Sequence, residues 1–414
     1  MDKNGKVKRP PQQRVTLTRQ KVVNGAIAAL ATHGVTNLTH RVVARAAGVS
    51  LAATTYHYAT KQDILVETSQ VLLAAYLEAF QRLEQRLRSD ENVDIRTLDE
   101  LIVRIVGNAL GRDRERSLAW CQLMLDGGRS ADGRLLAQRW YTKLDEIWTG
   151  ICDRLQTTTG LQPGAAIDLT VGLIVLLHPL DLNADSLLDL LNGRASLSQF
   201  SSVYAALRQE TDLASSPDNG NGARNAATRE RLVEATIEIL IKEGTAAVTY
   251  ASVADRAGMV RSGPSYYFPT ISGLLRAAQI TLFARAKARY REGIESIQPQ
   301  DIDEQRLIDL TTAVFFHELF QSPHENLGYY SVWMSAAQNL TLRAAVFESL
   351  YDQNRAWQRR LIAIFGDSVP APVPLWIQGL FAGKLIRGIA AQPATGDLAR
   401  SREDFAAMIR SAGA

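Results

Sequence analysis

The residues with the clearest chemical potential are the basic side chains of residues 1–61. Five Lys and five Arg lie there against one acid, Asp2, giving a net charge of +9, whereas the whole chain carries +3. Six of these bases fall within residues 1–19 with no apolar run behind them, which excludes a secretion signal and predicts a basic arm over 1–17. Such a stripe attracts a phosphate backbone through counterion release, although a solvated tail has the same composition.

Residue types used in catalysis and metal binding are present without the spacing that such chemistry needs. The six His form neither HxxxH nor HExxH, and the chain has no glycine-rich phosphate loop and no Gly-x-Ser-x-Gly. Two cysteines, Cys121 and Cys152, cannot form a metal cluster alone, and so few thiols suggest a reducing compartment. We expect no enzyme activity, no catalytic residues, no metal and no cofactor, and a cytoplasmic protein. A catalytic site assembled from distant residues would leave no such signature.

The composition favours helices in a protein of two to three domains. The 414 residues are 46% hydrophobic and include only 13 Pro and 28 Gly, which leaves few breaks between elements. The longest apolar stretch, residues 169–180, is interrupted by Gly172, His178 and Pro179 and falls short of the ~20 residues that a spanning helix needs. We therefore expect no membrane association.

An internal repeat sets the domain organisation. Residues 18–68 align without a gap on residues 228–278, and 14 of 51 positions are identical, where random pairing would give roughly three. A stretch rich in Ser, Asn, Gly and Asp separates the two copies and predicts a flexible linker. The predicted domains are a basic arm (1–17), head 1 (18–66), core 1 (67–208), a linker (209–226), head 2 (227–276) and core 2 (277–414).

Apolar spacing and caps predict three helices in each head. In head 1 the first helix ends at Gly34, Thr39 caps the second, and Ser50 caps a third that runs from Leu51 to about His57. Gly48 lies in the short turn between the last two, where a sharp reversal demands a positive φ. Two short helices joined in this way form a helix-turn-helix, whose second helix enters the major groove of DNA.

The combination of these motifs is more specific than the turn alone. The segments Leu38-Thr39, Val43-Ala44, Ala47-Gly48-Val49-Ser50, Tyr56-His57-Tyr58 and Thr60-Lys61 resemble the DNA-binding domain of the tetracycline-repressor (TetR) family. The resemblance covers both heads and implies an all-α fold, in which a long fourth helix leads to a helical core that binds a small effector and dimerises through its last two long helices. Residues 165–181 and 374–391 look like dimerisation helices. With two units in one chain, this implies an intramolecular pseudo-dimer of monomeric mass.

The resemblance also assigns residues that contact a double-stranded DNA operator. In head 1 these are Thr39, His40, Arg41, Ser50, Leu51, Ala52, Thr55, Tyr56, His57 and Lys61. Arg41 suits a bidentate guanine contact, and Lys61 is among those suited to phosphate, whereas Tyr58 fits core packing. In head 2 they are Thr249, Tyr250, Arg261, Ser262, Ser265, Tyr266 and Tyr267.

Head 2 departs from the pattern of head 1. Ala251 and Ile271 stand where head 1 has Arg41 and Lys61, and the net charge over residues 224–271 is only +1. Pro264 would break a helix capped at Val260 but is tolerated in the first turn of one capped at Ser262 or Gly263. Because operator symmetry mirrors protein symmetry, two unlike heads predict an asymmetric operator to which head 1 contributes more of the affinity.

The effector and the mode of control follow only from the resemblance. Aromatic, Met and His residues of the cores are candidates for an effector pocket, although such residues more often serve in packing. The candidates are Trp120, Met124, Trp140, His178, His317, Tyr330, Trp333 and Met334. We expect a repressor that an unidentified small molecule releases. The alternative is a regulator in which only head 1 binds DNA and head 2 is a structural or protein-interaction module.

Overall fold

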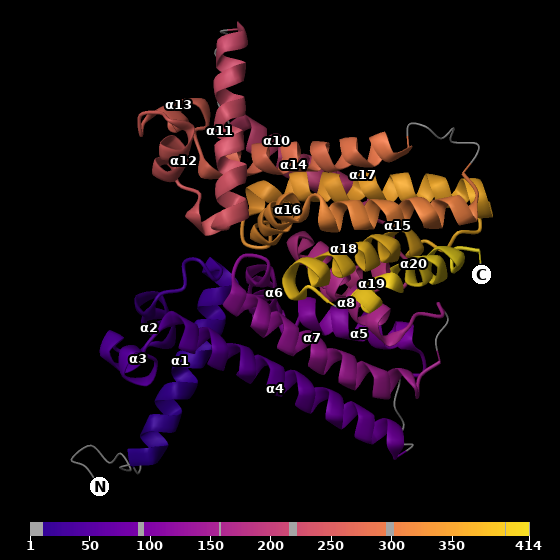
Figure 1. Ribbon diagram of the computed structural model, residues 1–414, viewed down its shortest axis with the longest axis horizontal. Coiled ribbons are helices and arrows are strands. Elements are labelled where there is room, and N and C mark those ends of the chain that lie inside the picture. Colours follow the sequence, from indigo (N-terminus) through magenta and orange to yellow (C-terminus); the bar gives the residue numbers. More distant parts are fainter. Residues whose placement is uncertain are drawn as a thin grey trace.

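A computed structural model describes residues 11–89, 95–156, 159–214, 222–294, 302–393 and 395–413. In these ranges the regular structure is helical, apart from one isolated bridge between Thr97 and Gln156 (Figure 1). The all-α fold expected from the sequence is confirmed. The first half contains α1 (Pro11–His33), α2 (His40–Ala47), α3 (Leu51–His57), α4 (Lys61–Arg88), α5 (Leu98–Leu110), α6 (Arg114–Gly127), α7 (Ala131–Cys152), α8 (Pro163–Leu177), α9 (Ala184–Leu191) and α10 (Ser201–Ala214).

The second half repeats this order of helices. It contains α11 (Gly222–Lys242), α12 (Tyr250–Ala257), α13 (Gly263–Tyr267), α14 (Ile271–Ile294), α15 (Glu304–Phe320), α16 (Pro323–Ser335), α17 (Leu340–Phe365), α18 (Val373–Ala391), α19 (Thr395–Ala399) and α20 (Ser401–Arg410). In Figure 1 the two halves lie one above the other, and α2, α3, α12 and α13 are at the same end of the molecule.

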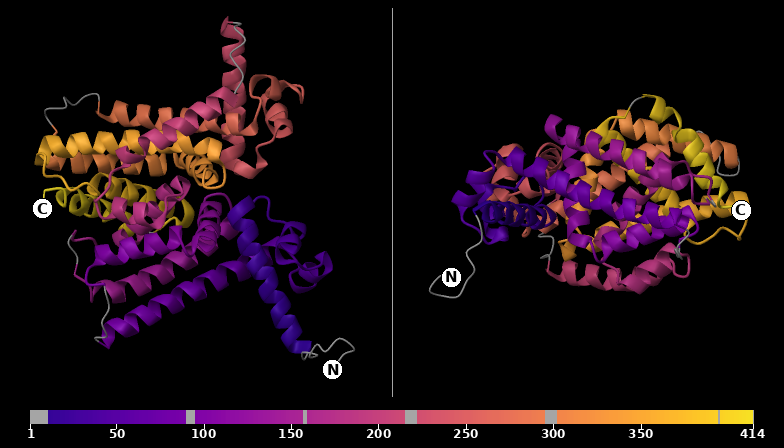
Figure 2. Two further views of the ribbon diagram at one scale, coloured as in Figure 1. Left: turned by 180° about the vertical axis from the view of Figure 1, so that it is seen from behind. Right: turned by 90° about the horizontal axis from the view of Figure 1, so that it is seen from below.

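The two halves are joined through α8 and α18, which cross at glycines. A Cβ added at Gly172 would collide with the backbone of Gly379, and one added at Gly383 would collide with the backbone of Asp168. Both helices are buried over nearly their whole length. The left view of Figure 2 shows the two halves from behind, again one above the other. Only residues without a side chain allow two backbones to approach so closely.

A buried charge cluster lies at the same joint. Lys384 Nζ is 3.4 Å from Asp168 Oδ2 and 2.7 Å from Asp404 Oδ2, and all three side chains are at most 7% exposed. Arg387 ion-pairs across the joint with Asp145 at 2.6 Å. Each charge has an opposite partner, as burial of ionised groups requires.

One segment has the length and composition of a membrane-crossing helix. It is Pro163–Leu180, with a mean hydropathy of 1.6, and 89% of it is buried inside the structure. The sequence led us to expect no stretch long enough to span, because Gly172 and Pro179 interrupt the apolar run. Gly172 instead lies within α8 at the crossing with α18, so the apolar face is covered by protein.

Two predicted boundaries differ from the observed helices. The basic arm was predicted over residues 1–17, but α1 already begins at Pro11, and residues 1–10 lie outside the described ranges. The linker was predicted over residues 209–226, but α10 continues to Ala214 and α11 begins at Gly222, so only residues 215–221 lie between helices and these are not described. A polar segment can stay helical when it extends a helix whose other residues are packed against the protein.

Candidate nucleic-acid interface and ligand pocket

The turn of head 1 is built by two side-chain caps and one glycine. Thr39 accepts a hydrogen bond from Val42 N at the start of α2, and Ser50 accepts one from Ala53 N at the start of α3. Gly48 has φ 62°, a left-handed conformation that glycine adopts without strain, and its N–H closes α2. These three residues fix the angle between α2 and α3.

The outer face of α3 is exposed. Tyr56 is 80% exposed, and its ring packs edge-to-face on His57 at 5.1 Å. Leu51, Ala52 and Thr55 are exposed on the same helix. Tyr58 is buried, and its ring lies 5.8 Å from the guanidinium of Arg19. The helix therefore offers a polar and aromatic surface, while Tyr58 serves in packing.

Residues around α2 complete this surface. Arg41 is exposed, and no ion pair joins it to another described residue. Thr39 and Ser50 are exposed, but their hydroxyls accept the capping hydrogen bonds, and His40 is half-buried. Arg41 is thus the predicted contact whose charged group is free to bind a base or a phosphate.

Lys61, predicted as a phosphate contact, has a hydrogen bond within head 1. Its Nζ donates to the carbonyl oxygen of Thr36 at 3.2 Å, and burial lowers the pKa of this ammonium. Because the side chain is half-buried against the loop between α1 and α2, it positions that loop. The ammonium has two further N–H donors, so a phosphate contact is compatible with this hydrogen bond. The sequence shows that Lys61 begins α4 but does not show where its side chain points.

Head 2 has a shorter exposed helix than head 1. Val260 stands at the position of Ser50 and cannot cap, so α13 starts two residues later than α3, with Ser262 at the N-cap and Pro264 in the first turn. The structure thus adopts the tolerated one of the two arrangements of Pro264. Arg261 is exposed but lies in the turn before α13.

Several polar groups of head 2 are bound within the head. The hydroxyl of Tyr250 donates to the carbonyl of Phe268 at 2.8 Å, and Arg256 pairs with Glu238 and Glu243, both at 3.2 Å. Thr249 caps α12, and the hydroxyl of Ser265 donates to the carbonyl of Ser262. Tyr266 is 70% exposed, whereas Tyr267 is half-buried. Tyr250, Thr249 and Ser265 therefore hold hydrogen bonds within head 2, whereas Arg261 and Tyr266 are exposed.

The two heads touch each other at corresponding loops. Thr36 donates to the carbonyl of Glu243, and Asn37 Nδ2 donates to the carbonyl of Ala246 at 3.4 Å. Arg129, which follows α6, donates to the carbonyl of Leu240 at 3.3 Å. These contacts fix the position of one head relative to the other.

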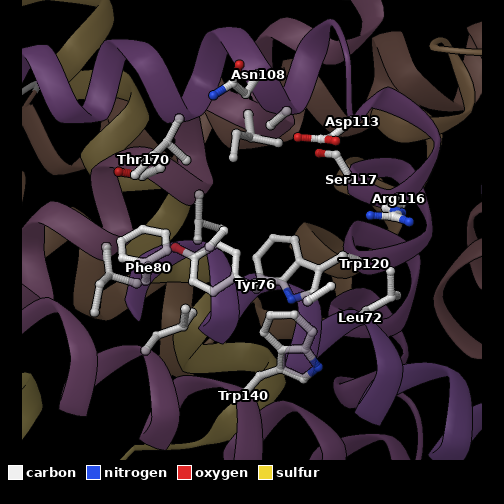
Figure 3. A pocket seen from close by; sticks show the side chains of 18 of the residues that line it. Leu72, Tyr76, Phe80, Asn108, Asp113, Arg116, Ser117, Trp120, Trp140 and Thr170 are labelled. Carbon is white, nitrogen blue, oxygen red and sulfur yellow. The ribbon is translucent and has the colours of Figure 1, made fainter. Parts of the chain in front are cut away.

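A pocket of about 650 Å³ lies inside core 1 between α4, α5, α6, α7 and α8. One wall is aromatic and contains Tyr76, Phe80, Trp120 and Trp140 (Figure 3). Asn108, Asp113 and Ser117 lie on the opposite side, and Arg116 lies beside Trp120. Aromatic walls with a few polar groups are typical of sites for small molecules.

The polar groups of this pocket differ in their availability. Trp140 Nε1 donates to Ser69 and Trp148 Nε1 donates to the hydroxyl of Tyr76 at 3.1 Å, but the buried Trp120 Nε1 has no acceptor among the described residues. Burial raises the pKa of the Tyr76 phenol, which keeps it neutral. Arg116 is exposed at the pocket and has no ion pair with another described residue.

Of the predicted effector residues, the structure brings Trp120 and Trp140 together in this pocket, with ring centroids 5.8 Å apart. The other candidates do not line it. Met124, Tyr330, Trp333 and Met334 are buried core residues, and His317 is exposed on α15. His178 is buried, and its Nε2 lies 2.9 Å from the hydroxyl of Ser117, itself a lining residue.

Sequence reasoning missed most of the pocket, notably Tyr76 and Phe80 on α4. Their spacing of four residues places them on one helix face and is the only signal the sequence offers. Nothing in the sequence indicates that this face meets the aromatic residues of α6 and α7.

No protein-family model matches the chain. Part of it is similar to the HTH-type transcriptional regulator CymR of Pseudomonas putida, with 29% identity over 97 residues, which are 23% of this chain. The chain thus spans about half the length of that relative, 48% of it. Among solved structures, it is similar to the multidrug binding protein EbrR complexed with imidazole, with 26% identity, a TM-score of 0.30, and coverage of 42% of this chain and 92% of that one.

Proposed function

We propose that the protein is a DNA-binding transcriptional regulator. The observation that carries this proposal is the exposed α3, held on a capped turn beside the unpaired Arg41, because this arrangement suits insertion into the major groove. The partial similarity to an HTH-type transcriptional regulator supports it. The protein acts in the cytoplasm, without enzyme activity or a cofactor.

Both heads act from one chain as a pseudo-dimer. The contact between α8 and α18 and the hydrogen bonds between the heads support this arrangement, since they hold the heads at a fixed separation. Because α3 and α13 differ, the operator is asymmetric, and head 1 contributes more of the affinity. A monomeric mass by sedimentation is expected, and a predominantly dimeric mass contradicts the proposal.

The regulator represses transcription, and the binding of a small molecule relieves this repression. The pocket in core 1 supports a ligand that has an aromatic ring, since such a molecule would stack on the aromatic wall. Residues of α4 line the pocket, and the start of the same helix follows α3 of head 1. A ligand that moves α4 would therefore move α3.

A nuclease footprint on the DNA upstream of the protein's own gene tests the proposal. We expect protection of two adjacent, unequal half-sites, and its loss in the Arg41→Ala variant. If no DNA is protected there or in a genome-wide selection of bound fragments, DNA binding is wrong.

A second candidate function is favoured by the ion pairs of Arg256 and by the short α13. In this version only head 1 binds DNA, and head 2 completes the fold or holds a protein partner. The two versions differ in salt dependence, since each neutralised phosphate steepens the plot of log K against log salt by about 0.9. Arg261→Ala leaves the slope unchanged if head 2 makes no phosphate contact.

A further inference from the structure

Core 2 contains an ion-pair network at the positions where core 1 has its pocket. Arg289 forms a bidentate pair with Glu318, with N–O distances of 2.7 and 2.8 Å, and a further pair with Glu325. Glu318 is 6% exposed and also accepts from Asn326 Nδ2 at 2.8 Å. Arg285 pairs with Glu325 and with Glu234.

The arginines of this network replace small residues of the pocket. The gapless alignment of the heads extends along α4 and α14, since each helix is unbroken. Arg285 and Arg289 then correspond to Ala75 and Ala79, which both line the pocket of core 1. Two methyl groups in core 1 thus become two long cationic side chains in core 2.

The carboxylates also correspond to pocket residues. Glu325 is the third residue after the N-cap of α16, as Arg116 is after the N-cap of α6. Glu318 precedes the C-cap of α15 by three residues, as Asn108 precedes that of α5. Arg116 and Asn108 both line the pocket. The network therefore joins four positions whose counterparts surround the cavity.

We propose that the chain binds a single ligand, in core 1, because core 2 fills the corresponding space with its own ion pairs. This inference rests on the proposed function for the role of the ligand. It also makes the response one-sided. Arg285 ties core 2 to Glu234 on α11, the first helix of head 2, whereas the corresponding residues of the first unit, Ala75 and Asn24, cannot form an ion pair.

Titration of the full-length protein with 1-anilinonaphthalene-8-sulfonate, an aromatic anion, tests the inference. We expect one dye molecule per chain. Ala79→Arg/Asn108→Glu gives core 1 the pair that fills core 2 and should abolish this binding. Gln81→Arg is the matched control, because it adds an arginine to α4 at an exposed position outside the pocket and should leave binding unchanged.

The reciprocal variant Arg285→Ala/Arg289→Ala/Glu318→Asn/Glu325→Arg gives core 2 the residues of core 1 and should raise the number of dye molecules to two. If it does not fold, the core 1 variants decide the matter alone. Three results would overturn the inference. They are two dye molecules on the wild-type chain, no dye binding, and one dye molecule that still binds the Ala79→Arg/Asn108→Glu variant.

Hydrogen exchange tests the one-sided response. At saturating dye we expect altered amide exchange in α1–α4 and none in α11–α14; equal changes in both heads contradict it. Footprinting of the same preparations separates the two proposals. If DNA is protected, the regulator proposal stands whatever the dye shows, and if dye binding follows the expected pattern without DNA protection, only the proposed function fails.

Discussion

The two heads share the order of their helices but use their polar groups differently. In head 1, Arg41 and the outer face of α3 are exposed and free of ion pairs within the described chain. In head 2, Arg256 is neutralised by two glutamates, and α13 is shorter than α3 because Val260 cannot cap it. The two heads therefore share their order of helices but differ in the length and cap of the exposed helix.

The two cores also differ, in the way that the last helix of each unit packs. The C-terminal helix of the first unit, α10, packs on α17 of the second, and Arg208 pairs with Glu348 across this contact at 2.7 Å. The corresponding helix α20 instead packs on α15 and α18 of its own unit. The second unit therefore packs against the C-terminal helices of both units.

The largest effect is expected where the two units meet. Gly172→Ala places a Cβ against the backbone of Gly379 and should lower the free energy of unfolding by about 3 kcal/mol, because neither backbone can yield locally. Gly150→Ala is the matched control. The nearest atom to its new Cβ is 3.8 Å away, and a helical Gly-to-Ala change should stabilise by about 0.5–1 kcal/mol. Urea denaturation measures both, and similar effects would mean that α8 and α18 do not meet at Gly172.

The second-largest effect is a difference in DNA affinity between variants of head 1 and head 2. Arg41→Ala should weaken binding to the footprinted DNA by about 2 kcal/mol, since a bidentate base contact is worth about 1–3 kcal/mol. Arg261→Ala should cost less than about 0.5 kcal/mol, because Arg261 lies in the turn before α13. Fluorescence anisotropy at fixed salt provides both constants. Equal losses together with a symmetric footprint would show that the two heads are equivalent readers.

The heads were the most predictable part of the fold. Thr39, Gly48 and Ser50 act locally, through caps and a left-handed turn, and local interactions can be read from spacing. The starts of α2 and α3 agree with the caps predicted at Thr39 and Ser50.

The pocket could not be predicted in the same way, because it depends on contacts between distant segments. Tyr76 meets Trp140 and Trp148, which lie on a different helix, and no periodicity reports that meeting. The hydrogen bond of Lys61 could not be predicted for a related reason, since its partner is a backbone carbonyl in another loop. The sequence gives the number of basic side chains but not the groups that each of them contacts.

A smaller effect distinguishes the ends of the two joining helices. α8 is followed by the buried His178, whereas α18 is followed by Gln392. Burial, and secondarily the charge of Arg114, lowers the pKa of His178 to about 3. The unfolded chain, with an ordinary pKa near 6.5, binds one more proton below that pH, so stability falls as the pH drops.

We expect this histidine to remove about 1 kcal/mol of stability between pH 7 and pH 5.5, and His178→Gln to abolish that part of the loss. His317→Gln is the control, because it removes an exposed imidazole in place of a buried one. Urea denaturation at the two pH values gives the comparison. An identical pH dependence in the wild type and His178→Gln would show that His178 titrates normally.

The smallest effect restores to head 2 a feature of head 1. α4 begins with a capping box in which Thr60 accepts from Asp63 N and the Asp63 carboxylate accepts from Thr60 N, whereas at the start of α14 Thr270 accepts from Gly273 N without a carboxylate in return. Gly273→Asp should therefore stabilise by about 0.5–1 kcal/mol at pH 7.

The control Gly273→Ala separates helix propensity from the cap. Hydrogen bonds from the backbone of Thr60 and from its side chain lower the pKa of Asp63, and the same contacts should lower that of the new aspartate. Its stabilisation is then present above the unfolded pKa of about 3.9 and is lost as the pH falls through the lower folded value. The advantage of Gly273→Asp over Gly273→Ala in thermal unfolding should thus disappear in acid. An advantage that persists at pH 2 would show that the carboxylate does not accept from Thr270, and that the two heads differ at this helix start only in propensity.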